Sequence, residues 1–126
     1  MTLTAKLSKI RQIAITVRNI DVSISFYHDV LGLDLSFRAN ENLACLDAEG
    51  IRIMLTTPQG AGSIGANSIL YFLVQDIESA HRSFIERGAT NERLPQLAAK
   101  MPDHELWLGF LRDPDGNLVG LMEEKR

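Results

Sequence analysis

His104 lies between two acidic residues in the segment Met101-Pro102-Asp103-His104-Glu105, which is the part of the sequence that best suits acid–base chemistry. An imidazole beside a carboxylate is typical of a general base, because the acid holds the ring in one tautomer. Counting back by twos from Phe110 along a predicted strand places His104 on the same face as Phe110. We therefore interpret His104 as a candidate base at the rim of a cleft, and Asp103 and Glu105 either as acids that orient it or as plain loop acids. The simpler interpretation is a rim histidine hydrogen-bonded to loop backbone.

Gln12 and Tyr71 are the other polar side chains that the strand pattern directs toward such a cleft. Tyr71 alternates with Ile69 and offers a hydroxyl group, and Gln12 offers an amide at the start of a strand. A hydrogen bond to the neighbouring strand would equally account for Gln12. Arg38 and Arg52 would neutralise an anionic ligand if they reach the cleft mouth, and are otherwise surface charges.

The remaining reactive residue types favour structural roles. His28 lies on the flank of a predicted helix, where we expect it to face solvent. His81 lies on the apolar face of a second helix, where we expect a core-edge histidine with satisfied hydrogen bonds. Cys45 is predicted to be an inert buried thiol in mid-strand, and Trp107 alternates to the face opposite the cleft. The sequence has no Ser–His–Asp order or Cys–His pair, and the glycines from Gly60 to Gly65 lack the Lys-Ser/Thr of a phosphate-binding loop.

The length and composition of the chain exclude several classes of protein. The chain has 126 residues, 45 % of them apolar, and a formal net charge of -3, as expected for one compact domain. No basic run is long enough for a nucleic-acid track, and no apolar run approaches the roughly 20 residues of a membrane span. Residues 1–6 lack the apolar stretch of a secretory signal, so we expect a cytoplasmic protein. Cys45 is the only cysteine, which excludes an internal disulfide and a cysteine-based zinc site.

A repeat organises the elements that must position these side chains. Val17–Asp21 and Val74–Glu78 share the pattern of valine, polar residue, Asn or Asp, isoleucine and acid, at an offset of 57 residues. A strand-like segment precedes each copy, Gln12–Val17 and Ile69–Val74, and an amphipathic helix of about three turns follows each.

The helix ends of the two copies also agree. Asn19 and Asp76 are suitable N-cap residues, since their side-chain oxygens can accept hydrogen bonds from the first backbone N–H groups. Gly32 and Gly88 follow the two helices at the position that favours positive φ.

The segments after each helix predict further strands, so each half is a β-α-β-β-β module. Pro95 restricts its strand to a sheet edge or a bulge. We therefore predict an α+β fold with two βαβββ modules at about residues 8–57 and 68–123, a linker at 58–67, helices on one side of the sheets and a cleft on the other. The strands expected after the helices are Leu33–Ala39, Leu43–Ala48, Ile51–Thr56, Thr90–Ala98, Leu106–Arg112 and Asn117–Met122.

Three segments make the chain resemble the vicinal-oxygen-chelate superfamily, which includes glyoxalase I, extradiol dioxygenases and bleomycin-resistance proteins. These segments are Ile13–Asp21 running into Phe26-Tyr27 and Leu31-Gly32-Leu33, then Tyr71–Ile77, then Phe110–Asn117 with its Asp-Pro-Asp-Gly-Asn turn. The resemblance extends from about Ile10 to Glu123 and implies paired modules around each cleft. Because this superfamily hosts unrelated chemistries and some pure binding, the resemblance implies the fold more strongly than the activity.

Metal-dependent members of that superfamily hold a divalent ion with four side chains from four strands. Alignment on the neighbouring motifs places these positions at Gln12, Met54, Ile69 and Gly120. Of these four, only Gln12 carries a suitable donor, since hard and borderline cations prefer nitrogen and oxygen ligands. We therefore expect neither a metal ion nor another cofactor.

These observations favour a metal-free protein that binds a small, partly apolar molecule, with no catalytic residue assigned. The first alternative is an enzyme, a lactoylglutathione lyase-like protein or a dioxygenase whose ligands are misaligned here, or one that uses His104 as a base. The second is a protein whose cleft is filled by its own side chains. We also expect a homodimer that binds neither nucleic acid nor membrane. The predicted cleft residues are Gln12, Met54, Ile69, Tyr71, His104, Leu106, Leu108, Phe110 and Met122.

Overall fold

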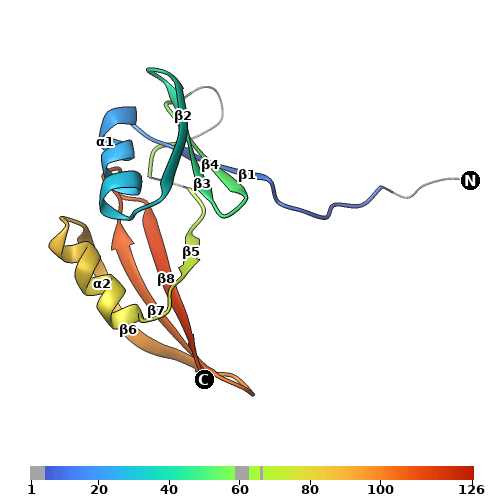
Figure 1. The fold of residues 1–126 in the computed structure, drawn as a ribbon, viewed down its shortest axis with the longest axis vertical. Helices are drawn as coiled ribbons and strands as arrows, with labels where there is room; N and C mark the ends of the chain where they lie inside the picture. The colour runs from blue at the N-terminus through green and yellow to red at the C-terminus, as the bar shows by residue number, and fades with distance from the viewer. Residues whose placement is uncertain (1–4, 59–62, 66) are drawn as a thin grey trace, which may run out of the picture.

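The structure is a computed structural model that describes residues 5–58, 63–65 and 67–126. Two four-stranded sheets lie end to end, and the helices cover the same side of both (Figure 1). The first module contains β1 (Gln12–Thr16), α1 (Ile20–Ile24), the π-helix η1 (Ser25–Val30), β2 (Asp34–Asn40), β3 (Leu43–Ala48) and β4 (Ile51–Thr56). The second contains β5 (Leu70–Leu73), α2 (Ile77–Glu86), β6 (Thr90–Lys100), β7 (Glu105–Arg112) and β8 (Leu118–Lys125).

The two sheets have the same topology, which confirms the predicted pair of βαβββ modules. Their strand orders are β1-β4-β3-β2 and β5-β8-β7-β6. In each sheet the strand before the helix pairs in parallel with the last strand, and the other pairs are antiparallel. Residues 59–62 and 66 of the predicted linker lie outside the described residues.

Capping side chains begin both helices where the sequence places them. Asn19 Oδ1 accepts a hydrogen bond from the Val22 N–H at 3.0 Å, and Asp76 Oδ1 accepts one from the Ser79 N–H at 3.1 Å. Gly32 and Gly88 follow the helices at φ values of 87° and 107°. These local interactions satisfy backbone groups that a helix end leaves without partners.

The first helix differs from the regular three-turn helix that its spacing predicts. It widens into η1, and both Phe26 and Tyr27 are buried there, with ring centroids 5.0 Å apart. On a regular α-helix the side chains of adjacent residues point about 100° apart. The wider η1 turn lets the rings of two adjacent residues reach the same core. Nothing in the apolar spacing distinguishes this arrangement from an ordinary helix.

Tyr27 connects the two modules through a buried carboxylate. Its hydroxyl donates to Asp113 Oδ2 at 2.7 Å, and the Asn117 side-chain amide donates to the same oxygen at 2.8 Å. Asp113 Oδ1 accepts from the Asp115 and Asn117 N–H groups at 2.9 and 2.8 Å. Burial, with Asp113 beside it, raises the pKa of the Tyr27 phenol far above its usual range.

One apolar core continues across both modules, with Ile15, Leu46 and Leu55 from the first and Leu111 and Leu121 from the second. Residues 5–11 instead run away from the body of the molecule (Figure 1), and Leu7 and Ile10 are 101 % and 63 % exposed. Within the described ranges, no helix has the length and apolar character needed to cross a membrane.

Candidate functional site

The second sheet has an open face, by which we mean the side away from α2. Residues on β8 alternate between the two sides: Val119 and Leu121 belong to the buried core, whereas Gly120 points to the open face. The register places Tyr71 and Phe110 on either side of Gly120. The Tyr71 and Phe110 ring centroids are 5.8 Å apart in an edge-to-face arrangement, so two of the predicted cleft residues meet here.

The ring of Tyr71 covers Gly120. A Cβ atom at position 120 would lie only 2.6 Å from Tyr71 Cδ2 and 3.0 Å from Cε2, closer than carbon atoms approach without displacement. Glycine is therefore what permits the ring to lie flat on β8. Tyr71 remains 47 % exposed, so one ring face stays available to a ligand.

A hollow of about 200 Å³ adjoins this aromatic pair, and Ile69, Phe110 and Leu118 form its apolar walls. Arg93 and Glu92 of β6 complete the lining. The Arg93 guanidinium carbon lies 6.0 Å from the Phe110 ring centroid. The strand pattern does not assign Arg93 to this face, because the register shifts on both sides of it interrupt the alternation along β6.

The other predicted lining residues extend the open face toward the end of the sheet. Met122 pairs with Leu108 across β7 and β8, and Leu106 pairs with Glu124 one step further. His104 comes directly before β7. It lies six residues from Phe110, which at about 3.4 Å per residue separates the two by roughly 20 Å. A molecule of benzoate size cannot contact both Tyr71 and His104.

Gln12 and Met54 lie on the corresponding face of the first sheet. The Gln12 side-chain amide donates to Met54 Sδ at 3.7 Å, and Arg52 Nη1 donates to Gln12 Oε1 at 3.4 Å. Arg52 thus lies on the same face of the first sheet as Gln12 and Met54. Arg38 does not, because it forms an ion pair with Asp21 on α1.

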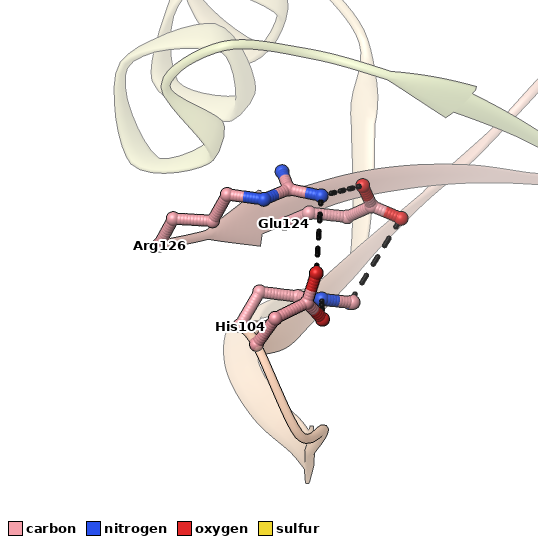
Figure 2. Close-up of polar contacts among 4 residues, drawn as sticks. His104, Glu124 and Arg126 are labelled. Carbon is pink, nitrogen blue, oxygen red and sulfur yellow. Dashed lines mark hydrogen bonds and ion pairs between the residues drawn. The ribbon is translucent and has the colours of Figure 1, made fainter.

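His104 is held between carboxylates at the far end of the second sheet (Figure 2). Its Nδ1 lies 2.7 Å from Asp103 Oδ1, and its Nε2 lies 3.9 Å from Glu124 Oε2. The hydrogen bond to His104 lowers the pKa of the Asp103 carboxyl below its usual range. Arg126 lies 3.4 Å from Glu124 and 3.9 Å from Asp103, which offsets part of this negative charge. The pairing of His104 with Asp103 agrees with the predicted orienting role of that acid.

Glu105, the other predicted orienting acid, lies on the opposite side of the sheet. Its Oε1 accepts a hydrogen bond from Trp107 Nε1 at 3.1 Å, and the Lys125 ammonium lies 4.2 Å from the centroid of the Trp107 ring. Lys125 also donates to Glu78 on α2, and this bond lowers the pKa of Glu78 and raises that of Lys125. Trp107 therefore faces the helix layer, as the alternation predicts.

The other reactive groups are placed as follows. Cys45 is buried, and His28 Nδ1 lies 2.6 Å from the Leu33 carbonyl oxygen. His81 is 3 % exposed, but its Nε2 has no hydrogen-bond partner among the described residues. The expectation of a satisfied histidine is wrong on this point, because sequence periodicity predicts burial and not the partners that tertiary packing supplies.

Comparison with known proteins identifies the family of this fold. Residues 9–121 match the family described as Glyoxalase/Bleomycin resistance protein/Dioxygenase superfamily. The chain belongs to this superfamily. Its members typically bind small molecules, and the resemblance inferred from the sequence is confirmed.

The similarity to individual relatives supports the fold of this chain and does not define an activity for it. The chain is 28 % identical to the uncharacterised protein YraH of Bacillus subtilis strain 168, over 88 % of this chain and 94 % of that protein. A virulence protein of Salmonella typhimurium superposes with a TM-score of 0.78 at 22 % identity, over 94 % of this chain and 98 % of that one. A lactoylglutathione lyase of Agrobacterium tumefaciens gives 0.76 at 21 % identity, over 94 % and 95 %.

The residues at the superfamily's metal positions do not fit a divalent ion. Ile69 and Gly120 have no donor side chain, and the Tyr71 ring occupies the space into which a side chain at position 120 would project. Gln12 and Met54 lie on the other sheet and contact each other. We therefore derive no chemical step through a metal ion at these positions.

Three carboxylates cluster at the start of α2, and each already accepts a hydrogen bond from the protein. Asp76, Glu78 and Glu123 lie within 4.8 Å of one another. Each accepts a hydrogen bond: Asp76 caps α2, Glu78 pairs with Lys125, and Glu123 Oε1 accepts from the Ile77 N–H at 2.9 Å. These bonds account for the cluster as part of the helix-capping structure.

Proposed function

We propose that this protein binds a small, partly apolar molecule without a metal ion, on the open face of its second sheet. The observation that carries the proposal is the packing of Tyr71 over Gly120, where metal-dependent members would place their last ligand. A partly exposed aromatic pair beside a hollow with apolar walls is typical of a site that recognises a flat or hydrophobic molecule.

The experiment combines metal titration with a ligand screen. Thermal unfolding is measured with Zn²⁺, Ni²⁺, Fe²⁺ or Mn²⁺, with and without EDTA, and then with a panel of flat aromatic compounds. We expect the metal ions to leave the midpoint unchanged and at least one compound to raise it in a saturable way, because a ligand specific for the native state stabilises it. A stoichiometric ion that EDTA removes with loss of stability would contradict the proposal.

Tyr71→Ala and Leu94→Ala form a matched pair for localising the best compound. Both side chains are large and exposed, at 47 % and 63 %, but Leu94 lies on the other side of the sheet beside His81 and Ile85. We expect Tyr71→Ala to weaken binding about tenfold or more through loss of the aromatic contact, and Leu94→Ala to leave it unchanged. Equal affinities in both variants would place the compound elsewhere.

The second candidate function is metal-independent proton transfer by His104. The bond from Nδ1 to Asp103 orients the ring so that Nε2 can accept a proton, and Glu124 Oε2 lies 3.9 Å from Nε2, which supports a general base. His104 lies about 20 Å from the aromatic pair on the strand spacing, so it would serve a different position on the open face. Compounds whose affinity falls in His104→Ala but not in Tyr71→Ala would favour this candidate.

The homodimer is the second part of the proposal. An apolar groove of about 490 Å³ lies between the modules, lined by Ile13, Ile51 and Ile53 of the first sheet and by residues 69–73. Leu73 is 68 % exposed there, and the arm at residues 5–11 also exposes apolar side chains. A second copy of the chain is the occupant that would cover the arm and the part of the groove around Ile51 and Leu73, and the exposed side of Tyr71 is left to the ligand. Light scattering during gel filtration at micromolar protein is expected to give twice the 14.0 kDa of one chain, and a mass of one chain would refute the dimer.

A further inference from the structure

Arg93 carries a positive charge that no carboxylate within the described residues neutralises. It is exposed on β6, and among the described residues its guanidinium contacts the Phe110 ring, whose centroid lies 6.0 Å from the guanidinium carbon. In-plane N–H groups of a guanidinium that lies over a ring remain free to donate hydrogen bonds. Arg93 therefore combines an aromatic contact with unused donors.

The neighbouring acid is already paired with a different cation. Glu92 Oε1 accepts from Arg112 Nε at 2.8 Å, and Arg112 Nη1 donates to the Gly116 carbonyl at 2.6 Å. The charges of Glu92 and Arg112 thus offset each other. The hollow keeps the net positive charge of Arg93, although the whole chain has a net charge of -3.

The strand register places the positive charge of Arg93 beside the proposed ligand-binding surface. Arg93 pairs with Phe110 in the register, and Phe110 in turn pairs with Gly120, over which Tyr71 lies. The hollow of about 200 Å³ thus has apolar walls and, at its edge, the guanidinium of Arg93, which pairs with no carboxylate of the described residues. Such a hollow suits a molecule with an aromatic or apolar body and an anionic group at one end.

We propose that Arg93 anchors the anionic group of the ligand, so that the binding site selects aromatic or apolar carboxylates or phosphates. This inference rests on the proposed binding function and specifies its ligand class. Guanidinium groups bind carboxylate and phosphate oxygens through two parallel hydrogen bonds, which are stronger than bonds between neutral groups. The aromatic pair supplies contact area for the ligand body, and Arg93 sets its orientation.

The test uses three probes with the same ring system: 2-naphthoate, 2-naphthyl phosphate and the neutral 2-naphthamide. Dissociation constants are measured by calorimetry with the full chain at low and high salt. We expect at least one anionic probe to bind about tenfold more tightly than 2-naphthamide, with a preference that falls as salt rises. The ratio between the carboxylate and the phosphate identifies which anion the site prefers.

Three variants assign the preference to one residue. Arg93→Gln is expected to remove it, with the affinity for 2-naphthamide little changed, and Arg93→Lys is expected to keep part of it. Arg82→Gln is the control, because Arg82 is an exposed arginine on α2, across the sheet from the open face. Anion preference that persists in Arg93→Gln would overturn the inference.

The results also separate this inference from the proposed function. If 2-naphthamide binds as tightly as the anionic probes, and Tyr71→Ala weakens all of them, the open face is a binding site without an anion anchor, and only this inference fails. If none of the probes binds and no compound of the screen depends on Tyr71, both proposals fail.

Discussion

Removal of the Tyr27 hydroxyl tests the connection between the two modules. In Tyr27→Phe the buried Asp113 carboxylate loses the donor at 2.7 Å but keeps three others, from Asn117 and the backbone of Asp115. A hydrogen bond to a charged group contributes roughly 1.5–3 kcal/mol, so we expect the free energy of unfolding to fall by about 2 kcal/mol. The midpoint of thermal unfolding should then fall by roughly 8 °C.

Urea unfolding at fixed protein concentration, followed by Trp107 fluorescence, measures this change. Tyr71→Phe is the matched control, because the Tyr71 hydroxyl has no hydrogen-bond partner in the described part of the chain and its ring is 47 % exposed. We expect Tyr71→Phe to change the free energy of unfolding by less than about 0.5 kcal/mol. A loss below about 1 kcal/mol in Tyr27→Phe would refute the reasoning that this hydrogen bond stabilises the folded chain.

The pH dependence gives a second check on the same interaction. Burial raises the pKa of the Tyr27 phenol in the folded chain, whereas the unfolded chain ionises near the ordinary value of 10.0. The folded chain therefore retains a proton that the unfolded chain releases. The stability from this group is complete below pH 10 and falls above it by up to about 1.4 kcal/mol per pH unit. Wild type should thus approach Tyr27→Phe in stability as the pH rises above 10, and a constant difference would count against the assignment.

Three further outcomes follow from individual contacts. Gly120→Ala should destabilise the chain by about 1–3 kcal/mol, because the new Cβ displaces the Tyr71 ring. The same substitution should cost much less in a Tyr71→Ala background, and additive effects of the two substitutions in urea unfolding would contradict the contact. Carbon NMR should show the Asp103 carboxyl titrating below its ordinary pKa of 3.8, and His104→Ala should raise the midpoint of that titration. The interaction between Asp103 and His104 is present above the ordinary pKa of Asp103 and is lost as the pH falls through the lowered pKa. His81→Leu should stabilise the chain by about 1 kcal/mol, because it removes a buried nitrogen that has no partner among the described residues, and a loss of stability would contradict this expectation.

Local signals account for much of what could be predicted. Asn19 and Asp76 cap helices through bonds to residues three positions away, so the nearby sequence suffices to place both helix starts. Strand alternation likewise placed Tyr71 and Phe110 on one face, because successive side chains in a strand point to opposite sides. The limits of β8 were less accurate: the turn marks where the strand starts, but pairing with β7 extends it to Lys125.

The candidate site could be predicted only in part, because its geometry depends on register between strands. Counting residues directs His104 and Tyr71 to the same face but does not measure the separation between them. Because Tyr71 and Phe110 both pair with Gly120, the distance from Tyr71 to His104 follows from the six residues that separate Phe110 from His104. Arg93 escaped prediction for a related reason, since the irregular pairing of β6 breaks the alternation by which its side could be assigned.

The sequence alone determined the repeat, the two βαβββ modules, the superfamily and the absence of donor side chains at Ile69 and Gly120. These properties follow from residue types and from spacings within a few positions along the chain. Tertiary structure alone decided that Tyr71 lies over Gly120, that the Arg93 guanidinium lies over the Phe110 ring, and that the Tyr27 hydroxyl meets a carboxylate 86 residues away. Each of these contacts joins residues distant in sequence, so its geometry depends on how the strands pair and the modules pack.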